Sequence, residues 1–264
     1  MASLPHKCGA GRKDSKRMDV FLLIGQSNMS GRGVIGDLPD ISSPHVHVFR
    51  DRVWTETHEP VVFDKPALAG EGMCLAFGNA LYMTTGHEIG LIPCSLGGSG
   101  LDQWLPGEPL FETAVEQTKD ALDADQDAHL CGILWHQGEN DSKHMEKSYT
   151  YLKRFRRVIG ALKNRLACSP SLPVLVAELG DYLDVNATSL YHRVINSQLH
   201  AFAESNPAYC CVTAHDLKDK GDALHFSTAS QRRLGLRFAC AYIDTVMRLS
   251  CSESSREFMD TEYL

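Results

Sequence analysis

Long apolar runs are absent from this sequence of 264 residues. No stretch approaches the roughly 20 consecutive apolar residues of a membrane-spanning helix, so we expect no association with a membrane. The first 18 residues carry several lysines and arginines but lack the apolar segment of a secretory signal. We therefore expect residues 1–18 to form a flexible N-terminal arm and the protein to be cytoplasmic.

An excess of positive charge is also missing. The chain has 26 Lys and Arg against 33 Asp and Glu, which gives a formal net charge of −7. Binding to nucleic acid needs a basic surface that neutralises phosphates, so the composition argues against nucleic acid as a main partner. No feature of the sequence indicates an oligomeric state.

Metal-binding spacings are lacking as well. No Cys-x-x-Cys pair and no zinc-type Cys/His spacing occurs, and the glycines do not match a phosphate-binding fingerprint. Several of the nine cysteines lie in apolar contexts: Cys74, Cys94, Cys131, Cys210, Cys211 and Cys240. Buried thiols are usually inert, so we predict reduced structural cysteines and neither a metal nor another cofactor.

What the sequence does contain is an alternation of short apolar strands with helices. The predicted buried strands are 21–24, 89–93, 130–135 and 173–179, and two further short strands are predicted at 45–49 and 210–213. The predicted helices are 72–84, 111–122, 146–166, 189–203 and 228–248. Such alternation indicates an α/β fold with a parallel sheet covered on both faces. No linker interrupts it, so we expect a single domain over residues 19–250 and a polar tail over 251–264.

Ser27 is the first candidate for a chemical role. It follows the apolar run Phe21–Ile24 after only Gly25 and Gln26, at the point where the first strand ends. Ligands of open α/β sheets bind outside the carboxyl ends of the strands, where a nucleophile would be placed. The alternative is that Ser27 caps the next segment. The sequence is not a Gly-x-Ser-x-Gly elbow, because Met29 stands where the second glycine would be.

Other polar segments are expected at the same edge. The loops at Gly97-Gly98 and at Gln137 each follow a predicted strand, and Asp222-Ala223-Leu224-His225 precedes the last helix. Acyl transfer needs a nucleophile, a base, a group that orients the base, and donors for the oxyanion. These roles would fall to Ser27, to His225 and to Asp222 in that order. His136, at the end of a strand, is the main rival base.

The oxyanion donors would be the backbone N–H groups of Ser27 and Gly98 and the side-chain amide of Gln137. Glycine suits such a loop because the backbone can approach a substrate closely. Each residue also has a structural alternative, because Gly97-Gly98 could be no more than a tight turn and Gln137 could tie loops together.

Four segments together resemble the sequence blocks of the SGNH hydrolases. They are Gly25-Gln26-Ser27-Asn28-Met29, Gly97-Gly98-Ser99, Trp135-His136-Gln137-Gly138-Glu139-Asn140-Asp141 and Asp222-Ala223-Leu224-His225. They are most similar to the branch of sialate O-acetylesterases and acetylxylan-esterase-related proteins, carbohydrate esterase family six. The resemblance covers residues 20–248.

This resemblance implies a flavodoxin-like, three-layer α/β/α sandwich and serine-dependent removal of acetyl groups from sugars without a metal. It implies Ser27 as nucleophile, His225 as base and Asp222 as its partner. Many SGNH enzymes use an asparagine of the third block as an oxyanion donor, whereas here Gln137 precedes Asn140 by three residues. Because Gln137 lies nearer the strand end, we predict that Gln137 serves and that Asn140 matters for stability.

The expected partner is therefore a small acetylated sugar or oligosaccharide, such as acetylated xylan. A general short-chain esterase or thioesterase using the same three residues is the enzymatic alternative, and a non-catalytic carbohydrate-binding protein is the alternative of another class. Arg32 and Trp104 lie near the proposed site and are candidate substrate contacts. Arg32 could instead form an internal ion pair, and Trp104 could pack beneath its loop.

Overall fold

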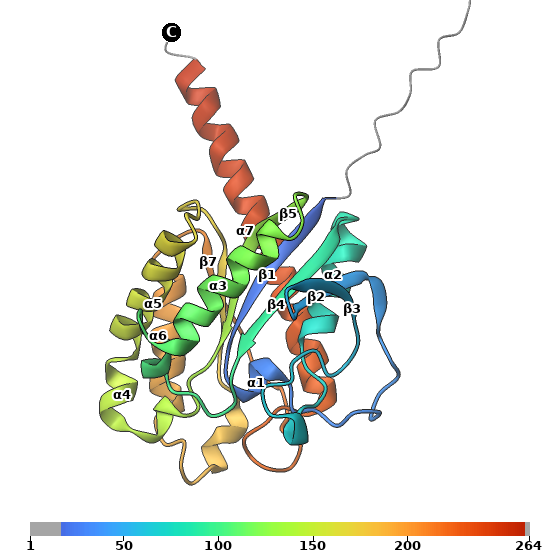
Figure 1. The fold of residues 1–264 in the computed structure, drawn as a ribbon. Coiled ribbons are helices and arrows are strands. Elements are labelled where there is room, and N and C mark those ends of the chain that lie inside the picture. Colours follow the sequence, from blue (N-terminus) through green and yellow to red (C-terminus); the bar gives the residue numbers. More distant parts are fainter. Residues whose placement is uncertain (1–16, 262–264) are drawn as a thin grey trace, which may run out of the picture.

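Seven strands form one sheet at the centre of the protein (Figure 1). The computed structural model describes the backbone of residues 17–261 and the side chains of residues 17–252, so nearly all of the predicted N-terminal arm lies outside the described residues. The strands are β1 (Met18–Gly25), β2 (Ser43–Arg50), β3 (Val53–Thr57), β4 (Glu88–Ser95), β5 (Ala128–His136), β6 (Val174–Ala177) and β7 (Tyr209–Val212). Their order is β3-β2-β4-β1-β5-β6-β7, and every pair is parallel except β2 with β3.

Helices cover both faces of this sheet. The α-helices of the described region are α1 (Ser27–Ser30), α2 (Cys74–Thr85), α3 (Pro109–Asp123), α4 (Met145–Tyr149), α5 (Tyr151–Arg165), α6 (His192–Ala203) and α7 (Thr228–Thr261). Short 3-10 turns are η1 (Pro66–Leu68), η2 (Leu101–Trp104), η3 (Asp141–Lys143) and η4 (Asp181–Val185). Within residues 17–261, every helix falls short of the length and apolar content needed to cross a membrane.

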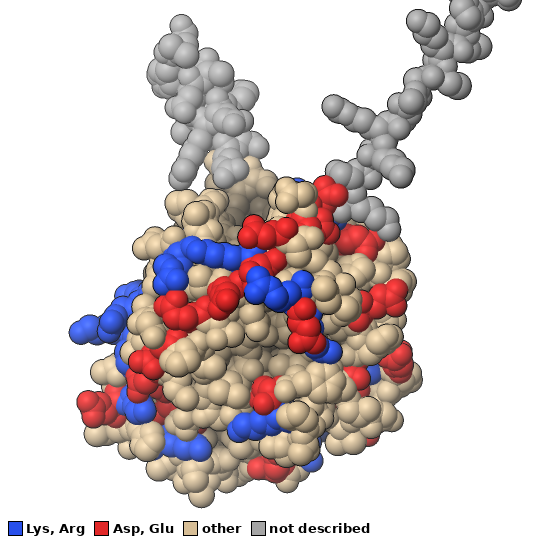
Figure 2. All heavy atoms as spheres, viewed as in Figure 1, with Lys and Arg blue, Asp and Glu red and all other residues tan. Residues whose placement is uncertain are grey.

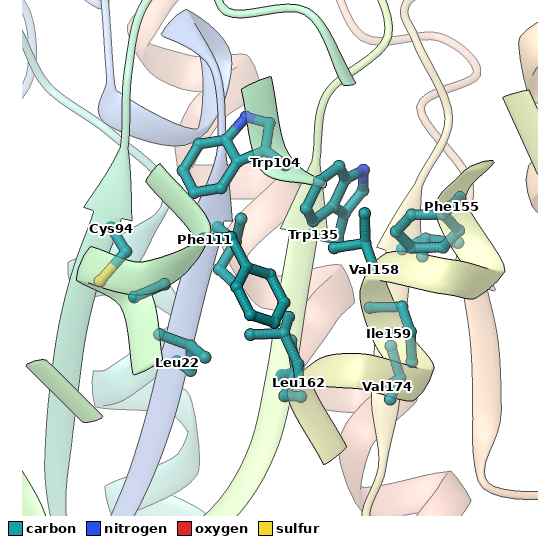
Figure 3. Packing of buried hydrophobic residues seen from close by; sticks show 14 of the residues in the cluster. Leu22, Cys94, Trp104, Phe111, Trp135, Phe155, Val158, Ile159, Leu162 and Val174 are labelled. Atoms are coloured by element: carbon teal, nitrogen blue, oxygen red, sulfur yellow. The ribbon is translucent and has the colours of Figure 1, made fainter. Parts of the chain in front are cut away.

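The alternation of side chains along β1 produces the three layers. Leu22 and its even-numbered neighbours pack in the core with residues of α3, α5 and α6, such as Phe155 (Figure 3). Phe21 and Leu23 face the opposite side and pack with residues of α2 and α7. Each fully buried side chain of this kind contributes about 1.5–3 kcal/mol relative to an exposed one. The predicted three-layer α/β/α fold is thus confirmed.

The antiparallel edge strand β3 was not predicted from the sequence. Asp51 and Arg52 form the turn between β2 and β3, and both have positive φ, 50° and 63°. This conformation suits a two-residue hairpin, but Asp-Arg lacks the glycine that usually signals one. The returning strand is also largely exposed and polar on an edge, so it carries no apolar periodicity.

The last helix is longer than expected. The sequence predicts an end at Arg248 and a polar tail over residues 251–264, but α7 continues to Thr261 and projects beyond the sheet (Figure 1). The hydrophobic period that indicates a helix here comes from the packed side chains of α7, and among the described side chains these end near residue 246.

Candidate active site

A cleft of about 590 Å³ opens at the carboxyl ends of β1, β4 and β5. Its lining includes Ser27, Gly98, Asn140, Asp222 and His225, which come from four separate segments of the chain. The loops that the sequence predicts to converge therefore do so at one edge of the sheet. Elsewhere, on the face of the protein shown in Figure 2, acidic and basic side chains are interspersed.

Gly25 determines how the chain leaves β1 to place Ser27. It is paired in register with His136 at the end of β5. A Cβ atom on Gly25 would lie 2.0 Å from the His136 carbonyl oxygen, so only glycine fits. The next amide, of Gln26, donates to that same carbonyl at 3.0 Å. The chain then enters α1 with Ser27 as its first residue, and Ser27 is only 6% exposed at the floor of the cleft.

Ser27, His225 and Asp222 form a continuous chain of hydrogen bonds. The Nε2 atom of His225 lies 3.1 Å from the Ser27 hydroxyl oxygen. The Nδ1 atom lies 2.7 Å from a carboxylate oxygen of Asp222. A carboxylate can only accept here, so it holds the proton on Nδ1 and leaves the Nε2 lone pair to accept the serine hydroxyl.

The Asp-x-x-His spacing is explained by a tight turn. The second carboxylate oxygen of Asp222 accepts the backbone N–H groups of Leu224 at 3.0 Å and His225 at 2.8 Å. Ala223 takes a positive φ of 53° to close the turn. Partial burial raises the pKa of the Asp222 carboxyl, but the hydrogen bonds from His225 and Leu224 outweigh burial, so this pKa lies below its ordinary value.

Three residues that line the cleft carry amide groups whose N–H donors make no hydrogen bond within the described part of the protein. The backbone amides of Ser27 and Gly98 and the side-chain amide of Asn140 have no acceptor among the residues that the structure describes. Gly98 has a φ of 81°, a left-handed conformation that glycine adopts without strain. Such free donors beside a nucleophile are the arrangement that stabilises a developing oxyanion.

The Gln137 amide is not among these donors, and the expectation that it points into the cleft needs revision. Gln137 is completely buried, and its NH₂ group donates to Asp141 at 2.7 Å, to the Ser99 carbonyl at 3.1 Å and to Gln26 at 3.3 Å. Its carbonyl oxygen accepts from Tyr151 at 2.9 Å. Gln137 therefore ties loops together, whereas Asn140 lines the cleft.

The two candidate substrate contacts differ in their placement. Arg32 lines the cleft, but its guanidinium is nearly inaccessible and pairs with Asp64 at 2.7 Å. Trp104 is 1% exposed, donates to the Ser99 hydroxyl and packs edge-on against Trp135 beneath the loop (Figure 3). The structure therefore places Trp104 in the core and not in the cleft.

Asp64 is a site residue that the sequence analysis missed. The carboxylate oxygen that binds Arg32 also accepts the Gly97 backbone N–H at 2.6 Å, which orients the loop that carries Gly98. Burial raises the pKa of Asp64, but the hydrogen bonds from Arg32 and Gly97 outweigh it and the pKa is lowered. Asp64 lies in an irregular stretch without periodicity, so no pattern in the sequence marks it.

The rival base, His136, is placed away from the cleft. It is completely buried at the end of β5, and its Nε2 atom lies 3.2 Å from the Glu178 carbonyl oxygen. Burial lowers its pKa. His136 does not line the cleft, whereas His225 does.

The cysteines of the described region are free thiols. Burial raises the pKa of Cys131 to about 11 and that of Cys94 to about 12, so the thiolate form is suppressed at neutral pH. No group of three or more His, Cys, Asp or Glu side chains in the described part of the chain is arranged to hold a metal ion.

Comparison with known proteins finds a family of similar sequence and structures of similar fold. The sequence model described as "Carbohydrate esterase, sialic acid-specific acetylesterase" matches residues 17–244. A probable carbohydrate esterase of Arabidopsis thaliana is 34% identical over 247 residues, which cover 85% of this chain and 90% of that protein. The solved structure of the Arabidopsis protein superposes with a TM-score of 0.77 and 28% identity, covering 87% of this chain and 99% of that one.

Two more distant structures share the fold. The crystal structure of NanS superposes with a TM-score of 0.70 at 16% identity, covering 88% of this chain and 98% of that chain. A carbohydrate acetylesterase from Xanthomonas citri superposes with a TM-score of 0.60 at 20% identity, covering 84% of this chain and 55% of that chain.

Proposed function

Because this chain belongs to the carbohydrate esterase family described as sialic acid-specific acetylesterases, we propose that it removes O-acetyl groups from sugars through an acyl-enzyme on Ser27. Membership makes the protein a carboxylic ester hydrolase. The observation that supports the serine mechanism is the hydrogen-bonded chain from Asp222 through His225 to Ser27 at the floor of an open cleft.

In the first half-reaction, the Ser27 hydroxyl oxygen attacks the acetyl carbonyl carbon while Nε2 of His225 takes the hydroxyl proton. Asp222 holds the imidazole in the required tautomer and stabilises its cation. The carbon–oxygen bond to the sugar then breaks, and the imidazolium gives its proton to the departing sugar oxygen. The acetyl group remains as an ester of Ser27.

In the second half-reaction, water attacks this ester and His225 takes a proton from the water. Collapse of the intermediate releases acetate, and the proton returns to the Ser27 oxygen. Each attack, by Ser27 and then by water, forms a tetrahedral intermediate that carries negative charge on the former carbonyl oxygen. We assign its stabilisation to the backbone amides of Ser27 and Gly98 and to the side-chain amide of Asn140, in place of Gln137.

The cleft also favours one kind of sugar. No Trp, Tyr or Phe is among its lining residues, so an aromatic stacking platform is absent from the described site. Three lysines line it instead: Lys65, Lys143 and Lys220. Lys65 and Lys143 make no ion pair with any described residue, although the chain as a whole is acidic. This arrangement supports an acetylated sugar that carries a carboxylate over neutral acetylated xylan.

Acetate release from a panel of esters tests the proposal. The panel contains O-acetylated sialic acid, acetylated uronic-acid oligosaccharides, acetylated xylo-oligosaccharides, a small aryl acetate and an acetyl thioester. We expect hydrolysis of the acetylated sugars, with the acidic ones preferred, and no turnover by Ser27→Ala. Activity confined to the aryl ester and thioester would indicate a general esterase. Sugar binding without serine-dependent turnover would indicate a binding protein.

A further inference from the structure

Asn28 connects the proposed nucleophile to the proposed base. It follows Ser27 directly in α1, and its side chain reaches the loop that carries His225. The side-chain Oδ1 atom of Asn28 accepts the Phe226 backbone N–H at 3.1 Å, and its side-chain NH₂ group donates to the Leu224 backbone carbonyl at 3.2 Å. Leu224 and Phe226 are the two neighbours of His225 in the chain, so one side chain holds the backbone on both sides of the base.

We propose that Asn28 is a positioning residue that sets the His225 imidazole against the Ser27 hydroxyl. This inference rests on the proposed serine mechanism. Asn28 is only 1% exposed and does not line the cleft, so its side chain is not placed to touch a substrate. Its effect must therefore pass through His225.

A buried carboxylate fixes the orientation of this amide. The NH₂ group of Asn28 donates to a carboxylate oxygen of Glu139 at 2.6 Å, and Glu139 is itself 1% exposed. The carboxylate and the Leu224 carbonyl can only accept, and the Phe226 N–H can only donate. A single orientation of the Asn28 amide satisfies all three partners, so the side chain cannot flip without losing them.

The other contacts of the base loop do not duplicate this role. The Leu224 carbonyl also accepts from the Tyr182 hydroxyl at 3.2 Å, but the Phe226 N–H has no second acceptor among the described residues. Asn186 donates to Ala223 on the far side of the turn from Phe226. Among the described residues, Asn28 is the one side chain that bonds to both neighbours of His225, and it directly follows Ser27.

Kinetics of Asn28→Ala and Asn28→Asp test the inference, because small misplacement of a base weakens proton transfer more than it weakens substrate binding. A displacement of about 1 Å costs about 100-fold in rate, so we expect kcat to fall by about that factor. We expect KM to change by less than about threefold, since Asn28 makes no contact in the cleft. Labelling of Ser27 by a fluorophosphonate should slow in parallel with kcat.

A double variant distinguishes loss of His225 positioning from a general loss of folding or stability. In Asn28→Asp the introduced carboxylate keeps an acceptor for the Phe226 N–H, but it faces Glu139 as a like charge. Adding Glu139→Gln replaces that repulsion with an amide that can donate to the new carboxylate. We expect the double variant to recover about tenfold in kcat over Asn28→Asp alone, because it removes the repulsion that would push the new carboxylate out of place.

Thr118→Ala is the control for loss of stability. Thr118 is completely buried in α3 and donates one hydrogen bond to the Ala114 carbonyl, outside the cleft. We expect it to lower the melting temperature without changing kcat. Wild-type kcat and labelling rate in folded Asn28→Ala, or a double variant no better than Asn28→Asp, would overturn the inference while leaving the serine mechanism intact. A wild-type protein that neither hydrolyses acetyl esters nor is labelled at Ser27 would overturn both.

Discussion

The two sides of the proposed catalytic pair are built in different ways. Ser27 follows β1, the central strand, whose residues are all buried between β4 and β5. His225 lies in a loop between the edge strand β7 and α7, and the Asp222 side chain in that loop is 38% exposed. Ser27 is therefore positioned by the core, whereas His225 is positioned by polar contacts between loops, some exposed, as at Asp222, and some buried, as at Asn28.

The two residues therefore differ in the interactions that resist their displacement. Moving Ser27 would require β1 to shift against its neighbours, because β1 is hydrogen-bonded to β4 on one side and to β5 on the other. Moving His225 would require the loss of only a few hydrogen bonds, each of which contributes about 1 kcal/mol net. The position of the base should thus be easier to disturb by single substitutions that leave the fold intact.

The largest expected effect comes from removing the nucleophile. Ser27→Ala should lower kcat by about 10⁴-fold or more, because the remaining residues cannot form the acyl-enzyme. The free energy of unfolding should change by less than about 0.5 kcal/mol, since the core that positions Ser27 is untouched. Acetate release and urea unfolding measure the two quantities. Fluorophosphonate labelling of a serine other than Ser27 would contradict the assignment.

The next effect distinguishes two amides that follow the same strand. Asn140→Ala should lower kcat by about 100- to 1000-fold with little change in KM, because an oxyanion donor acts mainly in the transition state. Gln137→Ala should instead cost about 2–3 kcal/mol of stability, because it leaves buried hydrogen-bonding partners unsatisfied. Kinetics and urea unfolding of both variants measure the contrast. A collapse of kcat in stable Gln137→Ala with near-normal Asn140→Ala would restore the assignment made from the sequence.

The Gln137 and Asn140 pair shows how far the sequence alone can predict such a site. Apolar runs locate the strands, and parallel pairing places their carboxyl ends together, so the converging loops are predictable. The direction of a side chain within a loop is not. Gly138 has a φ of 153°, and the turn there leaves Gln137 inside the protein and Asn140 in the cleft. No periodicity reports such a turn.

The same distinction accounts for the other differences. Trp104 is close to the site in sequence, but its large apolar surface is buried beside Trp135. Asp64 acts through contacts with Arg32 and Gly97, which are distant from it in sequence. The Asp-x-x-His turn, in contrast, is a local structure, and its geometry follows from the spacing of Asp222 and His225. Local patterns were predictable, whereas contacts that depend on tertiary structure were not.

A smaller effect is expected where the base loop has two supports. Tyr182→Phe removes the hydroxyl that donates to the Leu224 carbonyl, but Asn28 still donates to that oxygen. We therefore expect kcat to fall by less than about fivefold, which corresponds to about 1 kcal/mol for one hydrogen bond. Steady-state kinetics beside Asn28→Ala would check the ranking. Equal losses in the two variants would mean that the loop needs every contact and has no redundancy.

The smallest expected effect is a pH dependence of the free energy of unfolding that arises from Asp222, in the loop that carries His225. Hydrogen bonds from His225 and Leu224 lower the pKa of Asp222 despite partial burial. A lowered pKa means that the ionised carboxylate stabilises the fold above its unfolded pKa of about 3.9, and that this contribution disappears as the pH falls through the folded pKa. Solvent screens a side chain that is 38% exposed, so the contribution should be below about 1 kcal/mol.

Urea unfolding of the wild type and Asp222→Asn at pH 7 and pH 3 isolates the contribution of the Asp222 charge, because the other carboxylates titrate equally in both proteins. The wild type should be the more stable at pH 7, and the gap should narrow at pH 3. A difference in stability that is the same at both pH values would show that Asp222 acts through its shape and not through its charge. The loop that carries His225 would then be held by neutral contacts only.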